Sequence, residues 1–210
     1  MPSKLLATFV ALFAIASAAP QALPTPTVIA LPPTFPLPTS DWVTQIQPTV
    51  KLAGSPLHGK LINAAEGSFF IGKEPTTTCI DTAPCATFSY KTTIAFSQNN
   101  GWGNLSVAAP GGQFVYVLPT GEFEYTAPGA PAPTGAFNKG FLRAENFPPT
   151  GAIYASISFR GGGWLACPTG EEDVYRVFAA AFATASGCTA FEMHADEISD
   201  RSPQAYAFSA

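Results

Sequence analysis

The chain has 210 residues, of which 10 are basic and 14 acidic, so 11% of the residues are charged where soluble proteins carry about a quarter. With 21 prolines, 18 glycines and 47% apolar residues, this composition excludes a charge-rich disordered chain and a helical bundle rich in Ala, Glu, Lys and Leu. A formal net charge of -4 offers no basic surface to a phosphate backbone, so we expect no nucleic-acid partner.

Residues 1–18 have the pattern of a secretory signal peptide. Lys4 supplies a positive charge, residues 5–15 are apolar apart from Thr8, and residues 16–18 are the small residues that precede a cleavage site. The apolar run is shorter than the roughly 20 residues that cross a membrane, and the C-terminus lacks the hydrophobic tail of a glycolipid-anchor signal. We therefore predict a secreted protein, extracellular or held in the cell wall, with no membrane span.

Residues 19–50 are predicted to form a Pro-rich extended spacer. They contain eight prolines and one charged residue, Asp41, and proline removes backbone donors that helices and central strands need. Threonines between the prolines suit O-glycosylation. Trp42, Val43 and Ile46 are apolar and can dock the end of the spacer onto residues 51–210, which have the size of a single domain.

Three short stretches of this domain resemble one another. Each starts with a leucine, continues through a polar or Gly-containing turn, and ends in an apolar pair that begins nine residues after the leucine. The stretches start at Leu61, Leu105 and Leu165. Three similar strand pairs fit a β-trefoil, which is a closed antiparallel barrel, and a two-sheet β-sandwich is the alternative.

The four cysteines are predicted to form disulfides, because an even number in an exported protein favours disulfides over free thiols or zinc. Of the three pairings, locality favours Cys79 with Cys85 and Cys167 with Cys188. Neither pair has the C-x-x-C spacing of a zinc site, so no metal is predicted.

Strand patterns dominate the rest of the domain. Residues 88–96 and 153–159 alternate between apolar and polar side chains at period two. Residues 114–118 and 122–125 flank a Pro-Thr-Gly turn and predict a hairpin. Residues 175–185 suit either a turn of helix or a strand. We therefore predict an all-β, single compact antiparallel domain.

The chain has only two histidines, His58 and His194, and neither lies in a catalytic or zinc-binding motif. Glu122 and Glu124 share one face of the predicted hairpin and form a candidate for a glycosidase pair, but we favour a solvated hairpin face because they alternate with aromatic residues. No catalytic residue, metal or cofactor is predicted.

Two further sets of residues suggest contact with carbohydrate. Asn104 begins the one N-x-S/T sequon, so we predict that it is glycosylated at a loop edge. Four aromatic residues are candidates for stacking on sugars, although burial in the core is the favoured role for most of them because large aromatic residues are usually well buried: Trp102, Tyr116, Tyr125 and Trp164.

Several motifs occur in an order that resembles the fungal PhiA-like cell-wall proteins, a group that includes proteins described as IgE-binding antigens. The most specific are Pro110-Gly111-Gly112-Gln113 and Leu165-Ala166-Cys167-Pro168, within a resemblance that spans residues 55–191. It implies a secreted, non-enzymatic, wall-associated protein that is linked to conidiation or wall organisation and has wall polysaccharide or wall proteins as partners. A carbohydrate-binding module is the alternative function and a glycoside hydrolase the second alternative, while the oligomeric state is left open.

Overall fold

The computed structural model describes residues 43–80 and 85–210, and these ranges contain strands, turns and one 3-10 turn, η1 (Cys85–Thr87), but no α-helix. The strands are β1 (Val43–Lys51), β2 (Ile62–Ala65), β3 (Ser68–Ile71), β4 (Thr77–Thr78), β5 (Ile94–Ser97), β6 (Gly103–Leu105), β7 (Gln113–Val117), β8 (Phe123–Tyr125), β9 (Phe141–Asn146), β10 (Tyr154–Phe159), β11 (Trp164–Pro168), β12 (Tyr175–Ala179), β13 (Thr189–Glu197) and β14 (Ala207–Phe208). The predicted signal peptide and the spacer up to Trp42 lie outside the described residues.

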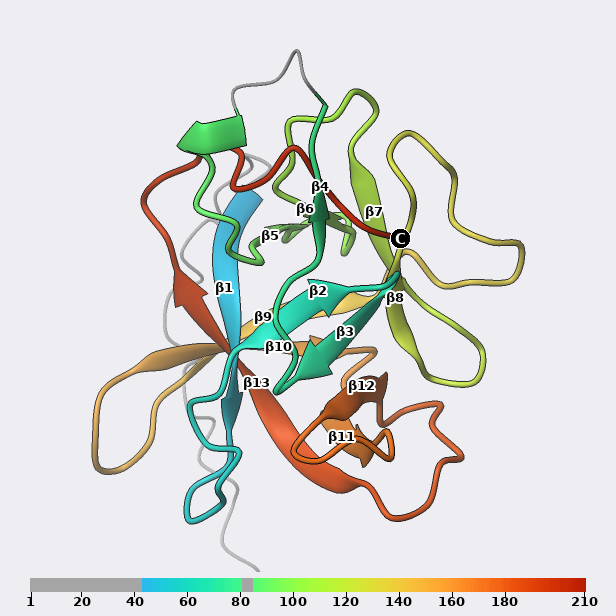
Figure 1. The fold of residues 1–210 in the computed structure, drawn as a ribbon. Coiled ribbons are helices and arrows are strands. Elements are labelled where there is room, and N and C mark those ends of the chain that lie inside the picture. The colour runs from blue at the N-terminus through green and yellow to red at the C-terminus, as the bar shows by residue number, and fades with distance from the viewer. Residues whose placement is uncertain (1–42, 81–84) are drawn as a thin grey trace, which may run out of the picture. The chain divides into compact units, whose positions relative to one another are not determined.

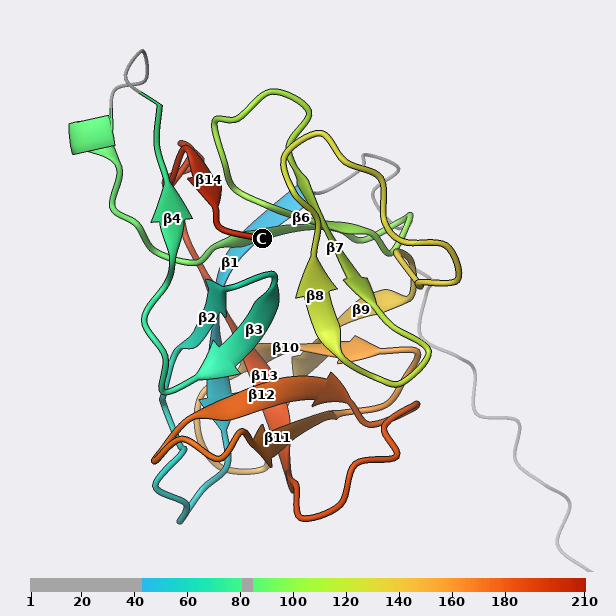
Figure 2. The ribbon, with the colours of Figure 1, turned by 45° about the vertical axis from the view of Figure 1, so that its right-hand side comes forward.

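Twelve strands belong to one antiparallel sheet, and the other two, β4 and β14, pair with each other beside it (Figure 2). The order of paired neighbours is β1-β5-β6-β7-β8-β3-β12-β11-β13, and β13 also pairs with β1, so this series of strands returns to its starting point. The hairpin β9–β10 extends from β13 and projects from the sheet (Figure 1). The prediction of an all-β antiparallel domain is therefore confirmed.

The three similar stretches are three hairpins, β2–β3, β6–β7 and β11–β12. Their positions in the sheet are not equivalent, because both strands of the second and third hairpins belong to the closed series whereas β2 lies outside it. The order therefore lacks the threefold repeat of a trefoil. A two-sheet sandwich does not describe it either, since one hydrogen-bonded sheet holds twelve strands.

Strand β1 corrects the predicted boundary at residue 50, because it begins at Val43 and lies between β5 and β13. Its single proline, Pro48, is tolerated for a geometric reason. The Val50 N–H donates to the Lys60 carbonyl at 2.9 Å, away from β13. Alternate residues of a strand direct their N–H groups to the same side, so Pro48 lacks an N–H on the side to which the Val50 N–H points. On that side the pairing of β1 with β5 ends at Ile46, so no ladder hydrogen bond is lost at Pro48.

The strand predicted at residues 88–96 is also shorter than its pattern suggested. Tyr90 has a positive φ of 57°, which interrupts an extended chain, and β5 begins only at Ile94. Thr92 is buried, and its hydroxyl accepts a hydrogen bond from the Ala64 N–H at 2.8 Å. This tertiary contact replaces strand pairing here. The strands predicted at residues 114–125 and 153–159 are present, and residues 175–179 form a strand.

An aromatic cluster fills the inside of the sheet. The rings of Phe69 and Phe123 stack with centroids 4.0 Å apart, and Phe123 lies 4.8 Å from Trp164. Phe141 lies 5.8 Å from Phe123, so strands β3, β8, β9 and β11 all contribute to one core. Because the alternate residues of β8 point inward, Glu124 lies between two buried aromatic residues and faces outward.

Both predicted disulfides are present, and they differ in the loops that they close. Cys79–Cys85 spans six residues, whereas Cys167–Cys188 spans 21 and joins the end of β11 to the segment before β13. We expect Cys167→Ala/Cys188→Ala to lower the free energy of unfolding by about 3 kcal/mol, because the longer loop loses more entropy on closure. Urea denaturation under non-reducing conditions measures this.

The matched control is Cys79→Ala/Cys85→Ala, for which the shorter loop predicts a loss of about 2 kcal/mol. A larger loss for this pair than for Cys167/Cys188 would contradict the argument from loop length.

Candidate functional site

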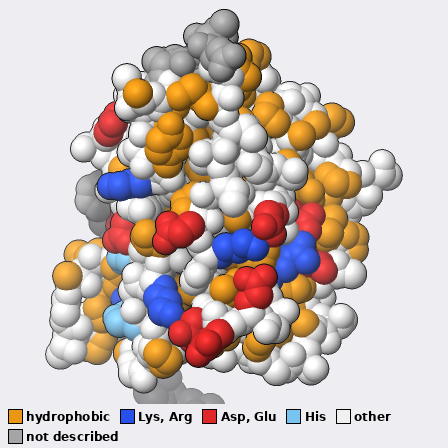
Figure 3. Space-filling model, viewed as in Figure 1, with side chains coloured by type: hydrophobic (Ala, Val, Ile, Leu, Met, Phe, Trp, Pro, Cys, Tyr) orange, Lys and Arg blue, Asp and Glu red, His pale blue; other side chains and the backbone are white. Residues whose placement is uncertain are grey.

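Charged groups are scarce in this chain, and those that form ion pairs gather around two hollows. Each of the five ion pairs among the described residues has at least one member in the wall of a hollow. Figure 3 shows charged side chains of both signs across the middle of one face, surrounded by apolar and uncharged surface. We call the two hollows the Arg176 pocket and the β13 groove.

The Arg176 pocket has a volume of about 340 Å³ and contains a polar group built by four strands. Ser68 of β3 and Tyr116 of β7 are both direct cross-strand neighbours of Glu124 on β8. Arg176 of β12 pairs with Phe70, two residues from Ser68 along β3. Directly opposed residues present their side chains on the same face of a sheet, so this register brings the four polar side chains together.

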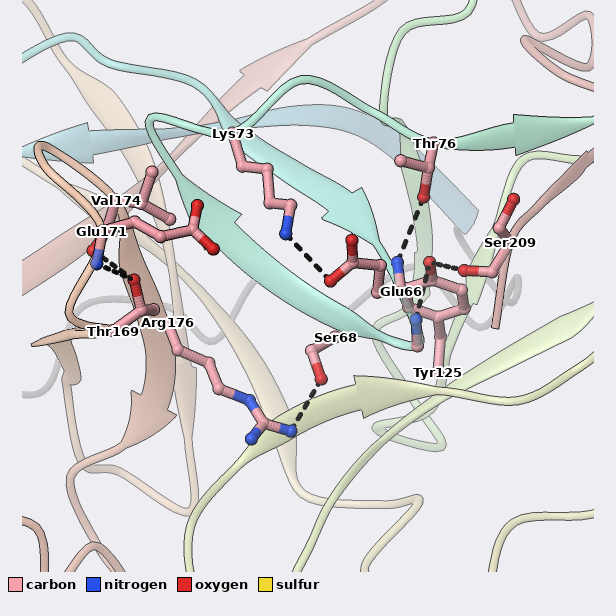
Figure 4. Close-up of polar contacts among 11 residues, drawn as sticks. Glu66, Ser68, Lys73, Thr76, Tyr125, Thr169, Glu171, Val174, Arg176 and Ser209 are labelled. Atoms are coloured by element: carbon pink, nitrogen blue, oxygen red, sulfur yellow. Dashed lines mark hydrogen bonds and ion pairs between the residues drawn. The ribbon is translucent and has the colours of Figure 1, made fainter.

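These side chains form a continuous hydrogen-bond network. One terminal nitrogen of Arg176 donates to Ser68 Oγ at 2.7 Å, as Figure 4 shows, and the same nitrogen donates to Glu124 Oε1. The Tyr116 hydroxyl donates to Glu124 Oε2 at 3.0 Å. Burial and the neighbouring negative charge of Glu124 raise the pKa of Tyr116 to about 12, so its hydroxyl keeps its proton at neutral pH.

The rest of the pocket wall has an apolar part and a charged part. The apolar part comes from the loop after β8, with Ala127, Ala130, Pro131 and Pro133. The charged part is Glu66, which forms an ion pair with Lys73 at 2.8 Å (Figure 4). The pocket therefore combines an apolar wall with fixed donors and acceptors.

The β13 groove consists of two adjoining hollows of about 450 and 430 Å³, which share Tyr154, His194 and Asp196 in their walls. The first lies between the β9–β10 hairpin and the end of β13, and Arg143 lines it and forms ion pairs with two glutamates. The second extends across β1 to His58 in the loop that follows.

The structure places the aromatic sugar-stacking candidates mostly inside the protein. Trp164 is 0% and Tyr125 2% exposed, and Tyr116 is 6% exposed, so their ring faces are packed against protein. The Trp164 indole N–H donates to the Ile157 carbonyl at 2.7 Å, and the Tyr125 hydroxyl donates to the Ser209 carbonyl. This burial overturns the stacking role for these rings. Trp102 is partly exposed and lies outside both hollows.

Other predicted residues have mixed outcomes. Glu124 lines the Arg176 pocket, whereas Glu122 bonds to Thr120 and does not line it, so the suggested glycosidase pair is not assembled there. Asn104 lies within β6, paired on both sides, rather than at a loop edge, and its glycosylation stays a prediction.

Sequence reasoning missed the neighbourhood of the two histidines. His58 and His194 line the same hollow although they are 136 positions apart, because residues 46–51 of β1 pair with residues 192–197 of β13. No short-range motif signals this. Among the described residues, no group of three His, Cys, Asp or Glu side chains is arranged to hold a metal ion.

The fold and its hollows define a disulfide-bonded, all-β protein with a charge-poor surface and localised polar sites. The chain matches the family model described as PhiA-like secreted protein over residues 49–209, and it belongs to that family. It is 31% identical over 150 residues to an uncharacterized secreted protein of Arthroderma benhamiae, with 68% of this chain and 71% of the relative covered. No solved structure matches the chain significantly.

These matches confirm the family resemblance, and they establish that this is a secreted fungal protein. Within residues 43–80 and 85–210, no helix has the length and apolar character needed to span a membrane.

Proposed function

We propose that this protein is a non-enzymatic component of the fungal cell wall that holds wall polysaccharide in the Arg176 pocket. The observation that carries the proposal is the network of Arg176, Glu124, Tyr116 and Ser68 in the wall of a hollow. A role in wall organisation during conidiation follows from the family resemblance and is part of the proposal, as are wall attachment and recognition by IgE.

The chemistry of this network suits a neutral, hydroxylated ligand. A sugar hydroxyl donates one hydrogen bond and accepts another, so adjacent hydroxyls can accept from a guanidinium and donate to a carboxylate at the same time. The Arg176 and Glu124 charges cancel, and side-chain exposures of 33% and 16% leave part of each group accessible. Arg176 repels a cationic ligand and Glu124 repels an anionic one, so a neutral ligand is favoured over both.

The apolar wall supports the same class of ligand. Pro131 and Pro133, with the two alanines of the loop, add carbon atoms to the wall that also holds the polar network. A sugar ring has apolar C–H faces and a polar rim of hydroxyls, and binding sites for such ligands combine apolar walls with a few fixed polar groups.

The same contacts argue against a hydrolase at this pocket. A glycosidase needs an acid that gives a proton to the leaving oxygen and a second carboxylate across the cleft. Glu124 accepts hydrogen bonds on both carboxylate oxygens, from Tyr116 and Arg176. Glu122 does not line the pocket, and the carboxylate of Glu66, which does, is held in an ion pair with Lys73. The arrangement of Glu124 suits binding rather than proton transfer.

The test is co-sedimentation of the purified mature protein with insoluble β-glucan, chitin and mannan. We expect saturable binding to at least one, and Arg176→Gln should weaken it by about 10- to 100-fold because hydrogen bonds to charged groups contribute about 1.5–3 kcal/mol. Tyr116→Phe removes one hydroxyl and keeps the ring, so a smaller loss, about 3- to 10-fold, is expected.

Arg201→Ala is the matched control, because Arg201 is exposed and lies outside both hollows. A thermal unfolding curve for each variant separates lost binding from lost folding. Equal binding by the wild type and folded Arg176→Gln would contradict this pocket as the site, and absence of binding to every polysaccharide would contradict the function.

A further inference from the structure

The second hollow of the β13 groove has a cation, Lys51, in its wall, and the direct cross-strand neighbour of Lys51 is Glu192. Lys51 lies at the end of β1 and lines this hollow, and its ammonium lies over the Tyr154 ring. None of the ion pairs found among the described residues involves Lys51. The aromatic face attracts the ammonium, and the N–H groups that point away from the ring are available to a ligand.

His58 adds a second donor on the same side. Its Nδ1 accepts a hydrogen bond from the Leu52 N–H at 3.1 Å, which requires that nitrogen to be unprotonated. The ring proton of the neutral imidazole is therefore on Nε2. The loop is fixed against β1, because the Gly59 N–H donates to the Val50 carbonyl at 2.8 Å and the Val50 N–H donates to the Lys60 carbonyl.

The carboxylates near this hollow already have donors. Asp196 accepts from the Thr49 hydroxyl at 2.9 Å, and its other carboxylate oxygen lies 3.0 Å from His194 Nε2. Glu192 accepts from the Tyr154 hydroxyl and from Asn146, both at 3.2 Å. Each of these carboxylates therefore already has two polar partners, whereas Lys51 belongs to none of the ion pairs among the described residues, so a ligand that supplies acceptors would complement Lys51.

We infer that this hollow binds a small ligand with a carboxylate or phosphate group attached to a ring. The anionic group lies between Lys51 and His58, and the ring lies against Tyr154 and Ala152. A volume of about 430 Å³ accommodates one such ring with its substituent. The ligand's source is either an acidic sugar residue of a glycan or a free aromatic acid, which share this chemistry.

The test is a titration of the ¹⁵N-labelled mature protein, followed by amide NMR shifts. Glucuronate and glucose 6-phosphate represent the acidic sugars, benzoate represents the aromatic acids, and glucose and benzyl alcohol are their neutral counterparts. We expect saturable shifts around Lys51, His58 and Tyr154 with an anionic probe at a Kd of about 1 mM, and at least tenfold weaker binding of its neutral counterpart. Binding of the sugars alone indicates a glycan as the source, and binding of benzoate indicates a broader aromatic acid site.

Variants then test the residues. Lys51→Gln is expected to weaken binding of the anionic probe about tenfold and His58→Ala about threefold, because each removes one donor to the anion. Lys91→Gln, which changes an exposed lysine outside the hollow, and Arg176→Gln should bind the probe as the wild type does.

Three results overturn the inference: an unchanged affinity in folded Lys51→Gln, equal affinity for charged and neutral probes, or shifts confined to residues outside this hollow. Because the Arg176 pocket is a separate site, the outcome is independent of polysaccharide binding there.

Discussion

Replacement of Gln113 by alanine is expected to lower the free energy of unfolding by about 4 kcal/mol and to release the C-terminal strand. Gln113 is 0% exposed. Its amide nitrogen donates to the Thr126 carbonyl at 2.8 Å and to the Phe208 carbonyl at 2.9 Å, while its oxygen accepts from the Phe208 N–H at 2.7 Å. Alanine leaves three backbone groups unpaired, and each buried unpaired group costs about 1–3 kcal/mol.

Chemical denaturation measures the total loss, and hydrogen exchange of the amides of Ala207 and Phe208 measures local release. The control is Gln98→Ala, because Gln98 is exposed in a turn and its change should alter stability by no more than about 0.5 kcal/mol. If hydrogen exchange of β14 is as slow in Gln113→Ala as in the wild type, Gln113 does not hold this strand.

Trp164→Ala should also cost about 4 kcal/mol, since it removes the largest fully buried side chain of the aromatic cluster. The indole contacts Phe123 and leaves no exposed face, so a cavity forms between β8 and β11. Trp164→Phe keeps most of the apolar contact but leaves the Ile157 carbonyl without its indole donor, and we expect a loss of about 1–2 kcal/mol.

Urea denaturation checks both values, with Phe147→Ala as the control because Phe147 is 69% exposed. The control should change stability by about 0.5 kcal/mol or less. A loss for Trp164→Ala no greater than that of the control would contradict the core role and would restore Trp164 as a candidate for ligand contact.

Local patterns in the sequence were informative where the structure depends on neighbours along the chain. The alternation in residues 153–159 predicted β10, and the turn at residues 119–121 predicted the β7–β8 hairpin. Locality also predicted both disulfides. The Pro-Gly-Gly-Gln motif marked a turn with two glycines at positive φ, and a Cβ at Gly111 would lie 2.5 Å from the Gly129 backbone.

Local patterns failed where long-range contacts decide. The alternation pattern placed Tyr90 in a strand, but its positive φ interrupts the extended chain. Two residues later, the Thr92 hydroxyl accepts a hydrogen bond from Ala64 of β2, which lies 28 positions earlier in the chain. Pro48 looked incompatible with a strand inside the sheet, but its missing N–H lies where β1 has no strand partner.

The sequence by itself predicted that this protein is exported, all-β and disulfide-bonded, because a signal-peptide pattern, period-two alternation and close cysteine pairs are local features. Only the tertiary structure decided which polar residues meet. Arg176 reaches Glu124 and His58 shares a hollow with His194 through strands that are distant in the chain. The physical reason is that the order and register of non-consecutive strands depend on how all their inward faces pack together, and no short segment encodes that choice.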